Sequence, residues 1–129
     1  MTPEELIRRY TEANGRNDFG TMESLRHGDW QERWPQSGEV VASSANYRMV
    51  RTQRREGQPS VETGRIGGSG DCWWSEEVIR YPDGSVWLGL TIFELRDGVV
   101  WRERVYFGPP FPAPEWRAAW VEQEEPAVS

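Results

Sequence analysis

Two short turn sequences inside one aromatic-rich run constrain the fold of this chain more than any other feature. They are YPDGS at 81–85 and LRDGV at 95–99. Proline or arginine suits the first bend of each turn, and glycine alone takes a positive φ without strain, so each sequence predicts a type I turn followed by a left-handed glycine. The run therefore predicts three antiparallel strands, with Tyr81 opposite Ser85 and Leu95 opposite Val99.

Counting outward from the two turns assigns the side chains to the two faces of this sheet. One face mixes aromatic rings with polar groups: Trp73, Ser75, Glu77, Ile79, Trp87, Gly89, Thr91, Phe93, Trp101, Glu103, Val105 and Phe107. The other face mixes aliphatic and charged groups: Trp74, Glu76, Val78, Arg80, Val86, Leu88, Leu90, Ile92, Arg102, Arg104 and Tyr106. Neither composition is typical of a fully solvated surface, so we expect both faces to be covered. A slip of one residue in the first turn exchanges Glu77 with Glu76, and this alternative stays open.

Length and charge limit the class of protein. At 129 residues the chain is long enough for one domain, over residues 1–129, and too short for two. The formal net charge is −6 and every basic residue is an arginine, which argues against nucleic acid and anionic membranes as partners. The absence of lysine is more simply explained by GC-rich codon usage in a bacterial genome than by chemistry. With a single cysteine, no signal peptide and no apolar run of membrane-spanning length, we expect a cytoplasmic protein.

Helix signals lie before the aromatic-rich run. Thr2 is the expected N-cap of a first helix that carries Tyr10 on its inner stripe and ends at Asn14-Gly15. Asp18 caps a second short helix that stops at Gly28. A third helix over 45–53, capped by Ser43 or Ser44, and strands at 29–34 and 61–67 complete the first half.

A proline-rich segment, 109–114, follows the run and cannot form a helix or a central strand. It leads to a terminal helix with Trp116 and Trp120 one turn apart, and we expect the acidic tail at 122–129 to fray. Helices followed by a long curved antiparallel sheet predict an α+β fold with the helices on one face.

Three segments carry a resemblance to a known family: RNDFGTMESL at 16–25, RWPQSGE at 33–39 and DGSVWLGLTIFELRDGVVWRERVYF at 83–107. Over nearly its whole length the chain resembles the nuclear transport factor 2-like superfamily, and within it the SnoaL-like branch. The resemblance implies a cone-shaped curved sheet wrapped around the N-terminal helices, a ligand cavity inside, and an outer sheet face that commonly pairs with a second subunit. The family includes ketosteroid isomerase, polyketide cyclases, limonene epoxide hydrolase, dehydratases and proteins without known catalysis, so the fold does not choose a function.

The isomerase pattern transfers to this chain at one of three positions. Tyr10 falls on the oxyanion-binding tyrosine of that enzyme, whereas its general-base aspartate falls on Trp34 and its second oxyanion donor on Thr91. Because tryptophan cannot abstract a proton, the resemblance does not favour isomerase chemistry by that mechanism. The SnoaL-like cyclases use a strand-borne aspartate with a histidine near it, and the late strands of this chain contain no histidine.

Glu103 is the first candidate for an acid or base. In the predicted register it shares a cross-strand row with Ser75 and Thr91, and burial among aromatic rings would raise its pKa toward neutrality. The structural alternative is an ion pair with a helix arginine such as Arg9 or Arg48. Further candidates for the cavity lining are Glu77, Trp34, Tyr47, Trp73, Trp87, Phe93 and Trp101.

The remaining motifs predict neither a metal nor a cofactor. His27 and Cys72 are the only histidine and cysteine, which is too few for a metal cluster. The glycine-rich segment 64–70 lacks the Lys-Ser/Thr pair of a phosphate-binding loop and predicts a sheet bulge or bend.

Two hypotheses about function remain, together with one about assembly. The first is a binding domain for a small apolar or aromatic molecule. The alternative is an enzyme of the polyketide cyclase, isomerase or dehydratase type that uses Glu103 as acid or base and Tyr10 as a donor. The apolar stripe Leu88, Leu90 and Ile92 on the outer face predicts a homodimer, because such a stripe is unusual on a soluble monomer.

Overall fold

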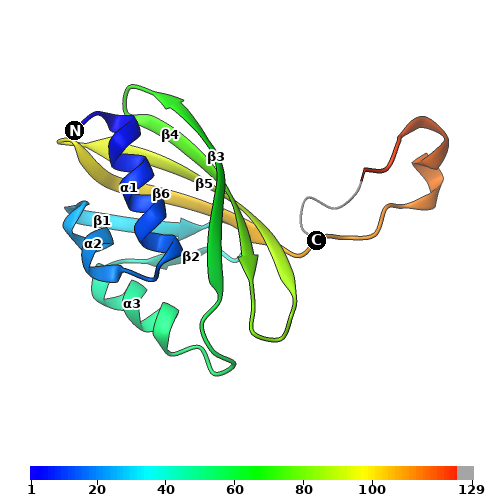
Figure 1. Cartoon of the computed structure of the whole chain (residues 1–129), viewed down its shortest axis with the longest axis horizontal. Coiled ribbons are helices and arrows are strands. Elements are labelled where there is room, and N and C mark those ends of the chain that lie inside the picture. The colour runs from blue at the N-terminus through cyan, green and yellow to red at the C-terminus, as the bar shows by residue number, and fades with distance from the viewer. Residues whose placement is uncertain (125–129) are drawn as a thin grey trace.

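A computed structural model describes residues 1–124, and over these residues six strands form one strongly curved sheet (Figure 1). The strands are β1 (Arg26–Trp34), β2 (Glu39–Val41), β3 (Ser60–Ser69), β4 (Cys72–Arg80), β5 (Val86–Arg96) and β6 (Val99–Gly108). Their order in the sheet is β2-β1-β6-β5-β4-β3. All neighbours are antiparallel except β1 and β6, which run parallel. The predicted α+β cone is confirmed.

The helices lie on the concave side of this sheet (Figure 1). They are α1 (Pro3–Gly15), α2 (Phe19–Ser24) and α3 (Ser44–Thr52). The predicted caps are confirmed, because the side chains of Thr2, Asp18 and Ser43 each accept a hydrogen bond from a backbone N–H in the first turn. The inner stripe of α1 packs into the core with Phe93 and Val100 of the sheet.

Some predicted boundaries are wrong. The second helix ends at Ser24 and not at Gly28, because the chain already enters β1 at Arg26. The short edge strand β2 was not predicted at all. The glycine-rich segment forms the end of β3, where the register with β4 shifts between Thr63 and Ile66, so the predicted bulge is confirmed. No helix of residues 1–124 is long and apolar enough to cross a membrane.

The first hairpin has the predicted register, with the backbone N–H of Tyr81 donating to the carbonyl oxygen of Ser85 at 2.9 Å. The second hairpin does not. Asp97 and Gly98 both have positive φ, 55° and 75°, which is the pattern of a two-residue type I′ turn, and Arg96 therefore pairs with Val99.

A bulge follows in β6 and corrects the alternation of faces. Leu95 pairs with Val100 and Glu94 with Arg102, so Trp101 is the extra residue. Glu103 then lies opposite Phe93, and the predicted row Ser75, Thr91, Glu103 is replaced by Ser75, Thr91, Val105. Because the shift of the turn and the bulge compensate, Glu103, Val105 and Phe107 still point to the concave face, as predicted.

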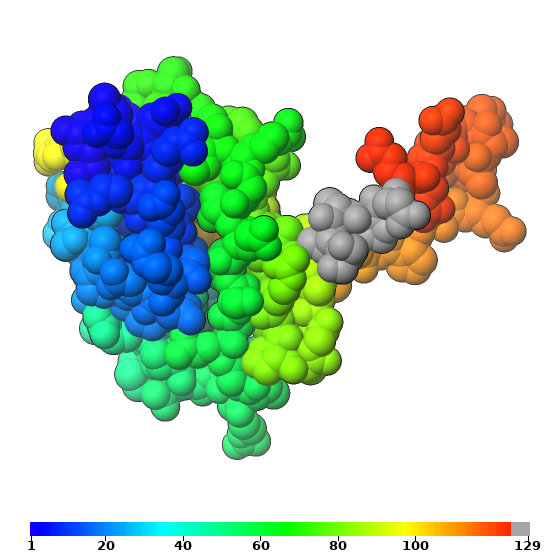
Figure 2. Space-filling model, viewed as in Figure 1, coloured from blue at the N-terminus to red at the C-terminus, as the bar shows by residue number. Residues whose placement is uncertain are grey.

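Beyond Gly108 the chain leaves the body of the domain as an arm that extends away from the sheet (Figure 1). Figure 2 shows the same arm standing clear of the helices and strands. The predicted terminal helix is a 3₁₀ helix, Glu115–Trp120, and the side chains of Phe111, Trp116 and Trp120 are 80%, 73% and 79% exposed. Residues 121–124 have no regular structure, and the rest of the expected frayed tail, 125–129, lies outside the described residues.

Candidate functional site

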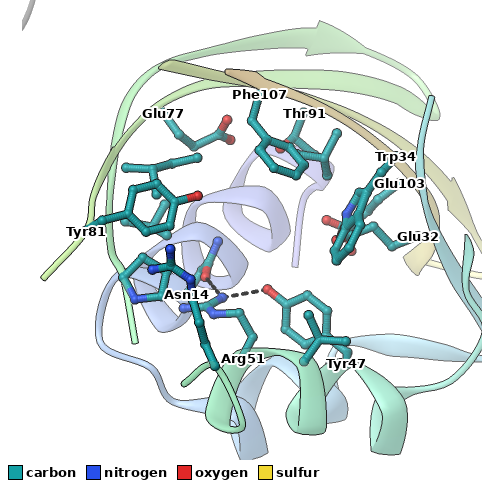
Figure 3. Close-up of a pocket in the computed structure, with 16 residues that line it drawn as sticks. Asn14, Glu32, Trp34, Tyr47, Arg51, Glu77, Tyr81, Thr91, Glu103 and Phe107 are labelled. Atoms are coloured by element: carbon teal, nitrogen blue, oxygen red, sulfur yellow. Dashed lines mark hydrogen bonds between the residues drawn. The ribbon is translucent and has the colours of Figure 1, made fainter. Parts of the chain in front are cut away.

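A half-open cavity of about 240 Å³ lies between α3 and the concave face of the sheet (Figure 3). Strands β1, β3, β4, β5 and β6 supply one wall, and α3, the loop after it and the end of α1 supply the other. The lining is mainly apolar and aromatic, with a small number of charged groups. The lining residues are Asn14, Glu32, Trp34, Tyr47, Val50, Arg51, Arg54, Pro59, Val61, Glu77, Ile79, Tyr81, Thr91, Glu103, Val105 and Phe107.

Glu32 and Glu103 form a pair of buried carboxyl groups at one side of the cavity (Figure 3). They are direct neighbours because β1 and β6 run parallel with these two residues in register. Glu103 accepts hydrogen bonds at Oε2 from Tyr10 Oη (2.6 Å) and from Trp30 Nε1 (2.7 Å). Glu32 accepts one at Oε2 from Trp34 Nε1 (2.8 Å).

This pair holds a proton at neutral pH. Burial and the neighbouring charge of Glu103 raise the pKa of Glu32 to about 8, although the hydrogen bond from Trp34 lowers it. Burial also raises the pKa of Glu103, although the Arg26 charge and the hydrogen bonds from Tyr10 and Trp30 oppose the shift. Two adjacent carboxyl groups in a low-dielectric site share one proton more readily than they carry two negative charges.

Arg26 lies behind the pair. Its Nε donates to Tyr10 Oη at 2.6 Å, so the guanidinium, the phenol and the Glu103 carboxyl form a continuous chain of hydrogen bonds. Its Cζ lies 3.8 Å from the ring centroid of Trp30 and 4.5 Å from that of Tyr47. The positive charge is therefore held between aromatic faces and beside the carboxyl pair, where both kinds of neighbour stabilise it.

Glu77 is a separate buried carboxyl on β4. Ser75 Oγ donates a hydrogen bond to its Oε1, while its Oε2 is buried without a hydrogen-bond partner among residues 1–124. Burial raises the pKa of Glu77 to about 7, although the hydroxyls of Ser75 and Thr91 lower it. A Cβ at Gly89, opposite Glu77, would lie 3.2 Å from Oε2, so the glycine leaves the space that this carboxyl occupies.

Arg51 on α3 lies on the opposite side of the cavity. It donates to Asn14 Oδ1 and Tyr47 Oη through Nη1 and to Asn17 Oδ1 through Nη2, each at 2.6 Å. Figure 3 shows the first two of these hydrogen bonds as dashed lines. Arg54, just beyond the end of α3, places its Cζ 4.3 Å from the ring centroid of Tyr81.

The structure brings five of the predicted site residues to the cavity: Trp34, Tyr47, Glu77, Thr91 and Glu103. The choice between neighbouring glutamates is settled, because Glu77 is buried on the concave face and Glu76 bonds to Arg65 on the outer one. The alternative ion pair of Glu103 with Arg9 or Arg48 is absent from residues 1–124, since Arg48 pairs with Glu23 and the arginine near Glu103 is Arg26.

Six predicted site residues lie elsewhere. Tyr10, Trp73, Ser75 and Phe93 are buried in the core beside the cavity, and Trp87 packs behind it against Tyr81 and Phe107. Trp101 was placed on the wrong face. As the bulged residue it lies between the guanidinium groups of Arg96 and Arg102, at 3.6 Å and 4.2 Å from its ring centroid.

Sequence reasoning missed Glu32, Arg26 and Arg51. A signal existed for Glu32, because Trp30, Glu32 and Trp34 alternate in the segment 30–34 and so share one face of a strand. No local pattern distinguishes Arg26 or Arg51 from the exposed arginines of the chain. Residues 1–124 contain no group of three His, Cys, Asp or Glu side chains arranged to hold a metal ion.

Comparison with known proteins gives the family. No protein-family model and no curated protein matches the chain. The chain is similar to an NTF2-like protein of unknown function from Burkholderia xenovorans LB400, whose crystal structure superposes with a TM-score of 0.80. The two sequences are 33% identical, and the match covers 95% of this chain and 94% of that one. The chain therefore belongs to the nuclear transport factor 2-like family.

Two structures of lower sequence identity share the fold. A proposed ketosteroid isomerase from Kribbella flavida DSM 17836 is 20% identical, over 96% of this chain and 90% of that one, with a TM-score of 0.83. A proposed SnoaL-like polyketide cyclase from Shewanella denitrificans OS-217 is 12% identical, over 83% and 92%, with a TM-score of 0.67. At these identities the likeness concerns the fold alone.

Proposed function

We propose that this chain binds a small, largely apolar or aromatic molecule in the cavity between α3 and the sheet. The main support for this proposal is the cavity itself. Its volume of about 240 Å³ suits a molecule of one or two rings, and Trp34, Tyr81 and Phe107 offer aromatic faces to it. Concave, mostly apolar sites with few well-placed polar groups are the usual form of small-molecule sites.

Titration calorimetry with 2-naphthol, an uncharged two-ring compound, tests the proposal. We expect saturable binding to the wild type. Val50 is partly exposed but lines the cavity, so the indole of Val50→Trp would occupy part of the cavity and should weaken binding by about tenfold or more. Met49→Trp, at the adjacent exposed position outside the lining, is the matched control and should bind like the wild type. Equal binding by the two variants would contradict the location of the site.

A second candidate function is proton transfer on the bound molecule, by an enzyme of the cyclase, isomerase or dehydratase type. The carboxyl pair Glu32 and Glu103 favours it, because this pair lines the cavity with one proton to give and one carboxylate to accept. In this proposal Glu103 is the acid or base. Tyr10 donates to Glu103 from behind the cavity wall, so it is a positioning residue and not a donor to the ligand.

Exchange of the α-protons of 2-tetralone in D₂O, followed by proton NMR, tests this candidate without knowledge of the natural substrate. We expect the wild type to accelerate exchange over buffer and Glu103→Gln to lose roughly 10²-fold of that acceleration. Glu94→Gln, on the outer side of the neighbouring strand, should keep it. If Glu103→Gln exchanges as fast as the wild type, the proton-transfer role of Glu103 is wrong.

We also propose that the protein forms a homodimer through the outer sheet face. Leu88 and Leu90 are 42% and 39% exposed there, and Ile92 continues the stripe. The arm adds further exposed aromatic area.

The single exposed cysteine, Cys72, fits a reducing compartment, which agrees with the expected cytoplasmic location.

Light scattering at micromolar protein is expected to give twice the mass of the chain. Leu90→Glu should shift the protein to the monomer, because it would bury charges in the contact. Met49→Glu, at an exposed position on α3 and therefore away from the outer sheet face, should leave the dimer intact. A chain that ends after Gly108 shows whether the arm contributes, and a wild-type monomer would contradict the outer-face dimer.

A further inference from the structure

Unsatisfied polar atoms gather on the lining of the cavity. Six buried side-chain polar atoms of residues 1–124 have no hydrogen-bond partner, and three of them, Glu77 Oε2, Arg51 Nε and Arg54 Nη1, belong to side chains that line this one cavity. Buried polar groups in native proteins are nearly always paired, because each unpaired group loses its hydration without compensation. Their convergence on one space indicates that a bound molecule supplies the missing partners.

The two arginines of the cavity lie apart from the carboxyl pair. Figure 3 shows Arg51 and Tyr81 on one side, Glu32 and Glu103 across from them, and Glu77 above Tyr81. Arg54 belongs to the first side, because its guanidinium lies over the Tyr81 ring. A molecule in the cavity therefore meets a positive end and an acidic end, with aromatic faces between them.

The two arginines of the positive end differ in what they can still bind. Arg51 uses Nη1 and Nη2 in three hydrogen bonds within the protein, so its guanidinium is already fixed. Arg54 is held by its stacking on Tyr81 and by an ion pair with Glu56, whose Oε2 lies 3.8 Å from Nε, too far for a hydrogen bond. Arg54 thus keeps free N–H groups for an anionic acceptor, and arginine binds carboxylates with particular strength.

Building on the proposed binding function, we propose that the ligand is an aromatic acid that bears a hydroxyl group. Its carboxylate accepts hydrogen bonds from Arg54, its ring system lies between Tyr81, Trp34 and Phe107, and its hydroxyl donates to Glu77 Oε2. The proposal assigns Arg54 as the residue that selects an anionic ligand over a neutral one of the same shape.

Titration calorimetry at neutral pH with three matched compounds tests this assignment. They are 6-hydroxy-2-naphthoate, 2-naphthoate, which lacks the hydroxyl, and 2-naphthol, which lacks the carboxylate. We expect the wild type to bind 6-hydroxy-2-naphthoate about tenfold more tightly than 2-naphthol, the size of one charge-assisted contact. Arg54→Gln should remove this preference by lowering the affinity for 6-hydroxy-2-naphthoate. Arg55→Gln, at the adjacent exposed residue, should keep the preference and so controls for net charge.

A second variant tests the role of Glu77. Glu77→Leu should bind 6-hydroxy-2-naphthoate no better than 2-naphthoate, while it keeps the preference for a carboxylate. A wild type that binds 2-naphthol and 6-hydroxy-2-naphthoate equally, or a preference that survives Arg54→Gln, would overturn the inference and leave the binding function standing. A wild type that binds none of the three compounds would overturn the binding function, and the inference with it.

Discussion

Glu77→Gln is expected to flatten the decline in the free energy of unfolding that the wild type shows between about pH 4.5 and about pH 7. In the unfolded chain this carboxyl ionises at its ordinary pKa of 4.5, whereas in the fold burial raises the pKa to about 7. Between these values the folded state binds the proton and the unfolded state does not. Stability from Glu77 is therefore fully present below about pH 4.5 and is lost as the pH rises to about 7.

The expected loss is large for a single side chain. A shift of one pKa unit corresponds to about 1.4 kcal/mol, so Glu77 accounts for about 3 kcal/mol of the difference between the two ends of this window. Glutamine keeps an acceptor for the Ser75 hydroxyl but does not titrate. Glu32 and Glu103 also make the free energy of unfolding fall as the pH rises, since their pKa values are raised too. Their contribution to this fall should persist in the variant.

Urea denaturation at a series of pH values measures the effect. The matched control is Glu76→Gln, one residue away on the outer face, where the side chain is half exposed and bonds to Arg65. This control should retain the wild-type slope. If Glu77→Gln retains it too, Glu77 is ionised in the folded protein and the picture of a neutral buried carboxyl is wrong.

Arg26→Met is expected to be the most destabilising single substitution at the site, by about 3–5 kcal/mol near pH 8, which is typical for a buried charge network that loses one member. The side chain keeps most of its length, so the loss reports the charge and the hydrogen bond to Tyr10 more than packing. Arg26 is the cation that faces Glu103 from the β1 side, and without it the carboxyl pair must hold its negative charge beside aromatic rings.

The pH dependence separates this explanation from a simple packing defect. Toward pH 5 the pair Glu32 and Glu103 can take up a second proton, so the destabilisation by Arg26→Met should shrink, whereas a packing defect costs the same at both values. Arg48→Gln removes an exposed ion pair with Glu23 and should change stability little at either pH. A destabilisation by Arg26→Met that does not depend on pH would contradict the electrostatic account.

Local signals in the sequence predict much of this fold. The caps at Thr2 and Asp18 were identified from residue type alone, and Ser43 was one of two candidates for the third, because each supplies a side-chain oxygen that accepts a hydrogen bond from a free backbone N–H at the helix N-terminus. The first hairpin was also predicted correctly. The second was not, because an Asp-Gly pair suits both a type I′ turn and the longer alternative, and the choice depends on how β6 packs at its bulge.

The site was harder to predict, for a physical reason. Glu103 could be found from the strand pattern of its own hairpin, but its partner Glu32 lies far away in the sequence. Only the parallel pairing of β1 with β6 brings the two carboxyls together, and no local pattern specifies which distant strand a strand will join. The supporting arginines were missed for the same reason, since their neighbours come from separate helices and strands.

The pairing of β1 with β6 also has a consequence for the order in which the chain folds. The hairpins β3–β4, β4–β5 and β5–β6 join strands adjacent in sequence, whereas β1 can pair with β6 only after a loop over residues 35–98, about half of the chain, has closed. During synthesis β1 leaves the ribosome long before β6 exists. Glu32 then lacks the neighbouring Glu103, whose charge helps to raise its pKa in the folded protein. The acidic pair is thus absent from every partly folded form in which the sheet is still open, and no such form offers the cavity to a ligand.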